Sequence, residues 1–187
     1  MFTPYYNETI RKIVVAFGSL FNDIQLRQTN SNGDLELVRV PLAYGPKEKF
    51  LRRIEEQSSI SNSTKVQITL PILGFNITDI TYDSTRKRNT MQKRRRHVSG
   101  ASAEYMSFNY TEVPYNFNIS LYSFTRTMND SLQIMEQILP FFTPEFNVTI
   151  NFNDVNQKVD VPVVLQSVSL DEEYEGDFDT RRNLTSE

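Results

Sequence analysis

Seven cationic residues lie within a fifteen-residue stretch, and such a run could bind a phosphate backbone or an acidic protein surface. They lie between Ser84 and Val98, where the sequence has no acid: Arg86, Lys87, Arg88, Lys93, Arg94, Arg95 and Arg96. Exposed Lys and Arg neutralise phosphates without reading base sequence. The run itself has no interleaved aromatic residue on which a base could stack. The sequence therefore favours an acidic protein surface as the partner, with incidental contact to DNA as the alternative.

A second charged run, of opposite sign, lies near the C-terminus. It begins with Asp171, Glu172 and Glu173, and residues 171–187 hold seven acids against two arginines. The formal charge of the whole chain is only −3. A basic and an acidic segment on one chain predict electrostatic pairing between copies or with other proteins. The alternative is that both segments are solvated and have no partner.

The residue types on which most enzymes depend are scarce in this sequence. Cys is absent, which excludes thiolate catalysis and Cys-ligated zinc, and the single His, His97, lies inside the basic run. The six glycines are scattered and form no phosphate-binding loop. The acids after residue 170 lack the pattern of a twelve-residue calcium loop. We therefore expect a protein that is not an enzyme and holds neither a cofactor nor a metal ion.

Length and composition favour one ordinary globular domain. The chain has 187 residues, of which 39% are hydrophobic and 23% charged. No run approaches the roughly 20 consecutive apolar residues of a membrane span. The first eight residues lack the basic start and apolar core of a signal peptide. We expect an intracellular protein that makes no contact with a membrane.

The spacing of apolar residues predicts three helices. The first covers residues 8–22, with Asn7 as the expected N-cap. A second is expected over 47–57. A third is expected over 130–139, with Asn129 as its N-cap.

Alternation of apolar and polar residues predicts about seven strands. They cover residues 23–29, 35–44, 66–70, 72–82, 105–127, 146–152 and 159–170. Residues 84–104 show no apolar periodicity and predict a long exposed basic loop, while 171–187 predict an acidic C-terminal tail. The expected fold is α+β, with a mainly antiparallel sheet flanked by about three helices in a single domain over residues 1–187.

The predicted helix and strand faces should together form one hydrophobic core. Its strongest candidates are Val14, Phe17, Phe21, Ile68, Ile119, Leu121, Ile134, Ile138 and Leu165. The corner after the third helix is a separate case, because Pro140 and Pro144 enclose Phe141 and Phe142. Either both phenylalanines fill the core, or one points outward to a neighbouring subunit.

Several stretches of the sequence resemble one known family across nearly the whole chain. The most specific part is Phe124-Thr125-Arg126, then Asp130, then the run from Gln133 to Asn147. Further matching stretches are Tyr5-Tyr6-Asn7 with Arg11, Gly18 to Ile24, Val38 to Tyr44 with Lys47-Glu48, and Leu70-Pro71. These resemble the tail sheath stabiliser and completion proteins of T-even-type contractile-tailed phages, in a version similar to that of marine cyanophages.

This resemblance implies a structural virion protein. It implies a hexameric ring that caps the finished contractile tail, sits on the tail-tube terminator protein and holds the last ring of the tail sheath protein. It also implies docking to the head-neck completion proteins, a location in the virion neck, and assembly in the host cytoplasm. A nucleic-acid-binding module that uses the basic loop is the alternative function.

The sequence departs from the family pattern in two places. The family's chain continues past Arg181-Arg182 into another strand and a further C-terminal portion, so we expect that strand to be missing here. The arginines at 94–96 also exceed the pattern of the T-even branch, so their role is not implied by the resemblance.

Overall fold

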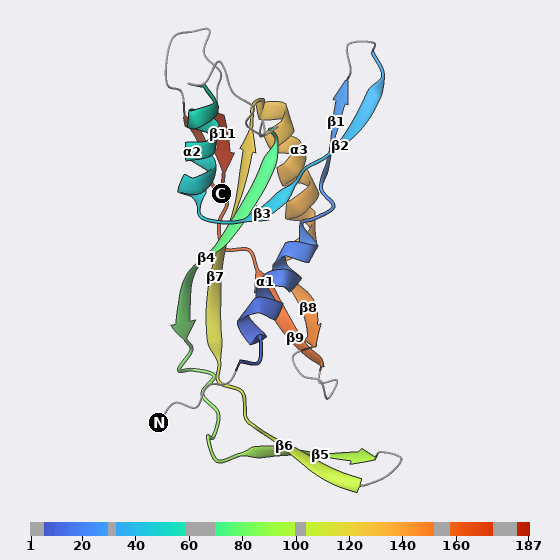
Figure 1. Cartoon of the computed structure of the whole chain (residues 1–187), viewed down its shortest axis with the longest axis vertical. Helices are drawn as coiled ribbons and strands as arrows, with labels where there is room; N and C mark the ends of the chain where they lie inside the picture. Colours follow the sequence, from blue (N-terminus) through green and yellow to red (C-terminus); the bar gives the residue numbers. More distant parts are fainter. Residues whose placement is uncertain (1–5, 30–32, 59–69, 100–103, 152–157, 174–182) are drawn as a thin grey trace. The chain divides into compact units, whose positions relative to one another are not determined.

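The computed structural model describes residues 6–29, 33–58, 70–99, 104–151, 158–173 and 183–187 (Figure 1). The chain divides into two units, one made of Met1–Asn76 and Ser120–Glu187 and the other of Ile77–Ile119. The described part has three α-helices and mainly antiparallel strands, which confirms the predicted α+β class. The expectation of one domain over residues 1–187 stays a prediction.

A five-stranded sheet runs through the first unit, with strand order β10-β11-β7-β4-β3. Its strands are β3 (Leu42–Tyr44), β4 (Ile72–Tyr82), β7 (Tyr115–Thr125), β10 (Leu170–Glu173) and β11 (Asn183–Ser186). Strand β3 runs parallel to β4, while β11 runs antiparallel to both β7 and β10. Strands β4 and β7 continue into the second unit, which contains residues 77–82 and 115–119.

The three predicted helices are confirmed, although the predicted caps are wrong. They are α1 (Thr9–Leu20), α2 (Lys47–Ser58) and α3 (Met128–Ile138), the last followed by the 3₁₀ turn η1 (Leu139–Phe141). The N-cap of α1 is Glu8 in a left-handed conformation, with φ 54° and no side-chain cap, instead of Asn7. The N-cap of α3 is Thr127, whose Oγ1 accepts a hydrogen bond from the Asp130 amide, so Asn129 lies inside the helix.

Two antiparallel ribbons complete the first unit. The predicted hairpin at 23–44 is present as β1 (Gln25–Thr29) and β2 (Leu35–Arg39). Its second strand is shorter than predicted, because Pro41 has no amide to donate and the chain leaves β2 before β3 begins. The second ribbon is β8 (Glu145–Asn151) with β9 (Lys158–Val164), and the strand predicted to reach residue 170 ends at Val164. The strand predicted over 66–70 lies almost wholly outside the described residues.

Among the described residues, most buried apolar side chains fall into two clusters, whereas one core was predicted. The first contains Phe21, Ile24, Leu26, Val40, Leu73 and Ile134, and the second contains Phe50, Tyr122 and Phe124. In the second cluster, helix α2 approaches the sheet so closely that a Cβ added to Gly74 would lie 2.6 Å from the Phe50 ring.

The predicted core residues fall into three groups. Phe21 and Ile134 are buried, and Phe17, Leu121 and Ile138 pack against them while partly exposed. Val14 and Ile119 are half-buried. Leu165 is an error of the sequence prediction, because it follows the end of β9 and is 36% exposed. Ile68 lies outside the described residues.

The second unit corrects the prediction of a structureless basic loop over 84–104. Residues Lys93–Ser99 form β5, which pairs with β6 (Glu104–Tyr110) as an antiparallel two-stranded ribbon. The strand predicted over 105–127 is also two strands, β6 and β7, with Pro114 between them. Strand prediction depends on an apolar face, and the charged strand β5 has none.

The acidic segment at 171–187, which was predicted as a tail, forms a strand at each of its two described ends. Strand β10 contains the first three acids, and β11 joins β10 to β7. The hydroxyls of Ser123 and Ser186 are buried and hydrogen-bonded to each other. The strand expected to be missing after Arg181-Arg182 is therefore present as β11. Residues 174–182, which hold three further acids of the run, lie outside the described residues, and the last acid, Glu187, follows β11.

Candidate functional site

The basic residues predicted as an interaction site lie in the second unit, on and beside the β5–β6 ribbon. Strand β5 places Lys93, Arg94, Arg95 and Arg96 in succession. In the register of the ribbon these lie opposite Tyr110, Asn109, Phe108 and Ser107. The other three cations, Arg86, Lys87 and Arg88, belong to the turn that leads into the ribbon.

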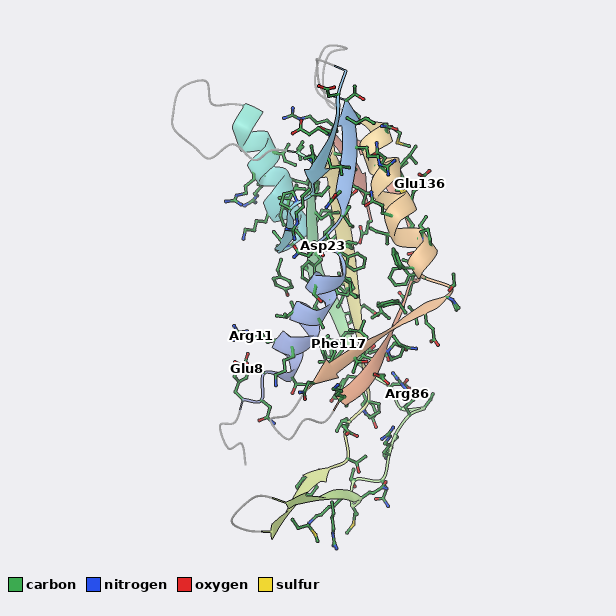
Figure 2. All side chains as sticks on the ribbon, turned by 90° about the vertical axis from the view of Figure 1, so that its right-hand side faces the viewer. Glu8, Arg11, Asp23, Arg86, Phe117 and Glu136 are labelled. Carbon is green, nitrogen blue, oxygen red and sulfur yellow. The ribbon has the colours of Figure 1, made fainter. Side chains whose placement is uncertain are left out.

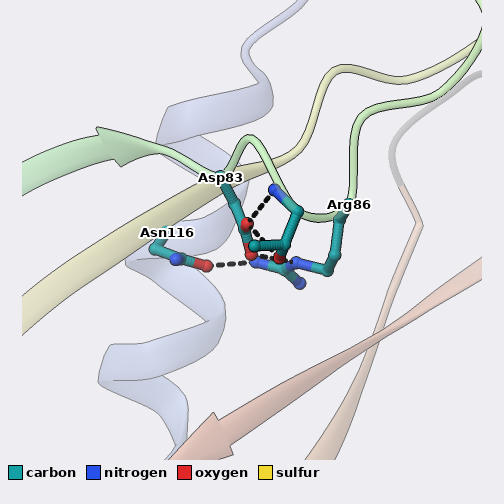
Figure 3. Close-up of polar contacts among 4 residues, drawn as sticks. Asp83, Arg86 and Asn116 are labelled. Carbon is teal, nitrogen blue, oxygen red and sulfur yellow. Dashed lines mark hydrogen bonds and ion pairs between the residues drawn. The ribbon is translucent and has the colours of Figure 1, made fainter.

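Arg86 makes polar contacts within its own unit, and its assignment as an interaction residue stays a prediction. Its Nε donates to Asp83 Oδ2 at 2.6 Å, and its Nη2 donates to Asn116 Oδ1 (Figure 3). The other oxygen, Asp83 Oδ1, accepts from Thr85 Oγ1 at 2.6 Å and from the Thr85 amide at 2.9 Å. These bonds tie the turn before the ribbon to the start of β7.

These hydrogen-bond donors lower the pKa of the Asp83 carboxyl. Hydrogen bonds from the Thr85 side chain, from Arg86 and from the Thr85 amide hold the pKa of Asp83 well below its ordinary value of 3.8. The carboxylate therefore stays charged far into the acid range.

The remaining cations divide between paired and exposed positions. Arg88 Nη1 lies 3.6 Å from Glu112 Oε2, and Lys93 Nζ lies 5.2 Å from the centre of the Tyr110 ring. Lys87 and Arg95 are exposed to solvent. The side chains of Arg94 and Arg96 lie outside the described set, although their backbone positions in β5 are given.

The acidic candidates lie in the first unit, on edge strand β10. Asp171 Oδ2 is 3.8 Å from Lys47 Nζ at the start of α2, so an intramolecular cation already faces it. Glu172 and Glu173 lie opposite Leu184 and Asn183 in the register, and their side chains are outside the described set.

The two phenylalanines of the corner, Phe141 and Phe142, differ in burial. Phe142 stacks on Phe21 at 6.5 Å between ring centres and packs against the first buried cluster. Phe141 is 67% exposed. Phe142 thus packs toward the core while Phe141 faces solvent, and the interaction role of both residues stays a prediction.

Four apolar side chains on α3 and η1, named here the exposed row, are open to solvent. The row contains Met128, Leu132, Leu139 and Phe141. The first three members are four and seven residues apart, which places them on one side of the helix. Ile134, one of the buried residues of α3, belongs to the core. Helix α3 thus has two apolar sides, and only one of them is covered within the described part of the chain.

Sequence reasoning missed two glutamines on α3 that hold a strand edge. Gln133 and Gln137 bond to the backbone of Arg27 and Gln25 on β1. Glu136, between them in sequence, lies on the exposed side of the helix (Figure 2). The four-residue spacing of Gln133 and Gln137 could have indicated this contact from the sequence, because it places both side-chain amides on one side of the helix.

The described residues hold no metal-binding arrangement. They contain no group of three or more His, Cys, Asp or Glu that could hold a metal ion. An open cleft lies between α1 and β8, with Glu8 and Arg11 at its rim, and these two form an ion pair at 3.1 Å (Figure 2). Within the described ranges, no helix has the length and hydrophobicity needed to span a membrane.

Comparisons with known proteins identify relatives for nearly the whole chain. The family described as T4-like virus Myoviridae tail sheath stabiliser matches residues 4–187. A curated relative, the tail completion protein gp15 of Enterobacteria phage T4, is 33% identical over 190 residues. The match covers 98% of this chain and 68% of the T4 protein.

Proposed function

The chain belongs to the tail sheath stabiliser family of T4-like phages, and we propose that it acts as a closed ring of six copies capping the contractile tail. The observation that carries this proposal is the family match over residues 4–187, which includes every element of the described fold.

The work of such a ring is mechanical. A tail stops growing when its last subunits meet a surface that matches them on one side and offers no further site for growth on the other. Head-to-tail contacts around a closed ring give every copy the same environment and leave no unpaired end. The ring would hold the last sheath ring and rest on the tail-tube terminator protein. Its other side would dock to the head-neck completion proteins.

We assign the contact between neighbouring copies to the exposed row of α3 and η1. Contiguous apolar surface on a folded protein marks an interaction site more often than isolated apolar residues do. Aromatic residues contribute strongly at such contacts, and Phe141 is the most exposed member of the row at 67%. The stacking of Phe142 on Phe21 fixes the corner from inside, so Phe141 is presented from a rigid base.

Location follows from this role. The protein would lie in the virion neck, at the head-proximal end of the tail, and would join the tail during assembly in the host cytoplasm. The T4 relative is a tail completion protein, which supports this placement.

Tails assembled without the protein provide the test. Purified wild-type protein added to such tails should raise the fraction that keep an extended sheath, counted in electron micrographs. Phe141→Ser should fold normally and fail to protect the sheath. Leu35→Ser serves as a control that is matched for exposure, because Leu35 is 79% exposed on another element, β2. Sheath protection by Phe141→Ser equal to that by wild type would overturn the assignment of the contact.

A further inference from the structure

The second unit has an aromatic face where the end of β4 lies beside the start of β7. The rings of Tyr82 and Tyr115 meet edge to face with 5.6 Å between their centres, so both side chains lie on one face of the two strands. Ile80 shares this face with Tyr82, because alternate residues of a strand point the same way. The three side chains, named here the aromatic face, are exposed by 45% at Ile80, 46% at Tyr82 and 50% at Tyr115.

The strands that carry the aromatic face have no further strand beside them in the described sheet. Strand β3 pairs with β4 only at residues 73–75, and β11 pairs with β7 only at residues 123–125. A two-stranded ribbon is marginally stable in water and gains stability when its apolar face packs against a helix. The described residues of the second unit include no helix. The helix that covers the aromatic face therefore has to come from outside this unit.

The opposite face of the same two strands is polar. Thr81 lies between Ile80 and Tyr82 in sequence, and Asn116 follows Tyr115, so both belong to that opposite face. Both are exposed to solvent. Asn116 Oδ1 also accepts the hydrogen bond from Arg86 (Figure 3). The two strands thus have one apolar face, and a helix that packs on them has one face to cover.

The exposed row of α3 and η1 is the helical surface that matches this face. The exposed apolar residues of α1, Ile10 and Val15, are five positions apart and lie on different sides of that helix. The exposed residues in the described part of α2 are all charged. On α3, by contrast, Met128, Leu132 and Leu139 share one side.

We infer that the aromatic face of one copy receives the exposed row of the neighbouring copy. This inference rests on the ring under Proposed function. In a closed ring of more than two copies, neighbours meet head to tail, so each contact joins two different surfaces of the chain. The exposed row is one of these surfaces, and the aromatic face supplies the other. A helix laid on a sheet face is a standard packing arrangement, and contacts between the Met128 sulfur and tyrosine rings are favourable.

Mixing two variants of the full-length protein tests this pairing. Phe141→Ser damages the exposed row and keeps the aromatic face, whereas Tyr115→Ser keeps the row and damages the face. Each variant alone should sediment as a single chain. An equal mixture should give particles near twice 21.8 kDa, because one intact contact forms between the two kinds of chain and no second contact can extend it.

Two further variants separate the contact from folding and from general loss of an aromatic ring. Ile80→Ser leaves both tyrosine rings in place and should behave like Tyr115→Ser, alone and in the mixture. Tyr110→Ser removes a tyrosine of the same unit that is 64% exposed on β6, and it should assemble like wild type. Thermal melts of each variant check that it is folded.

The mixing result and the wild-type result overturn different statements. Single chains in the mixture, with wild type forming rings, would overturn the pairing of row and face and leave the ring intact. Tyr115→Ser and Ile80→Ser variants that assemble like wild type would also overturn the pairing. Two-chain particles in the mixture, with wild type forming no closed ring, would support the pairing and overturn the ring. Single chains in every sample would overturn both.

Discussion

Gln137 binds both backbone groups of Gln25, with Gln25 N donating to Gln137 Oε1 at 3.3 Å and Gln137 Nε2 donating to Gln25 O at 2.8 Å. One helical turn earlier, Gln133 Oε1 accepts from the Arg27 amide at 2.9 Å. Two side-chain amides of α3 thus take the place of a neighbouring strand along the edge of β1 that β2 leaves open. They fix the β1–β2 ribbon to the helix whose other side carries the exposed apolar row.

Removing one of these amides should weaken the fold modestly. Gln137→Ala deletes both bonds to Gln25, and each intramolecular hydrogen bond contributes about 1 kcal/mol net. We expect the free energy of unfolding to fall by about 1–2 kcal/mol in urea denaturation. Glu136→Ala, on the exposed side of the same helix, is the control and should change stability little. Equal stability of the two variants would show that the amide pair is dispensable.

The close approach of Phe50 to Gly74 predicts a position that tolerates no side chain. A Cβ at Gly74 would lie 2.6 Å from Phe50 Cε2, whereas a Cβ at Gly45 meets the same ring at an ordinary 3.5 Å. Gly74→Ala should therefore lower the free energy of unfolding by about 1–3 kcal/mol, as overpacking does. Gly45→Ala is the control. The double variant Gly74→Ala, Phe50→Leu should lose less than the sum of its parts, and strict additivity would contradict the contact.

The carboxyl of Asp83 should titrate below its ordinary pKa of 3.8. NMR of its side-chain carbonyl carbon measures this directly, and Thr85→Ala should raise the pKa because the Thr85 hydroxyl is its main hydrogen-bond donor. Since the pKa is lower in the folded chain, the stability from Asp83 is complete above about pH 4 and is lost as the pH falls further. A pKa unchanged by Thr85→Ala would contradict the role given to that bond.

Serine substitutions at the two phenylalanines of the corner should affect different properties, stability at Phe142 and assembly at Phe141. Phe142→Ser removes a ring that stacks on Phe21 and packs on the first cluster, so its melting temperature should fall by several degrees. Phe141→Ser should melt like wild type, because Phe141 contributes little to the core, and should lose assembly. Thermal melts of both variants check the expected stabilities, and sedimentation of both checks the expected assembly states. A destabilised Phe141→Ser variant would contradict the division.

Sequence patterns predicted elements that bury an apolar face and missed those that do not. Helices α1 and α3 and the β1–β2 ribbon were found because their apolar residues repeat with the period of the element. Strand β5 was read as loop because four successive cations have no such period. Strand β11 was also missed, since its partner β7 lies about 60 residues earlier in the chain and sequence periodicity says nothing about distant pairing.

The sequence predicted which residues belong to the candidate site, and the contacts in the structure distinguish the exposed ones from those that bind within the chain. Residue type and spacing identified the basic run and the phenylalanine corner. They could not show that Arg86 is bound by Asp83 and Asn116, or that Phe142 faces the core while Phe141 faces solvent. Such assignments depend on which residues of other elements lie nearby, and one sequence alone does not record that.

Imaging of the purified protein tests the closed ring most directly. Negative-stain electron micrographs of the wild-type chain should show rings with six-fold symmetry, and sedimentation should give a mass near six times 21.8 kDa. Phe141→Ser should give particles of single-chain mass under the same conditions. Wild-type particles that stay single chains at every concentration tested, or that form open filaments, would contradict the account.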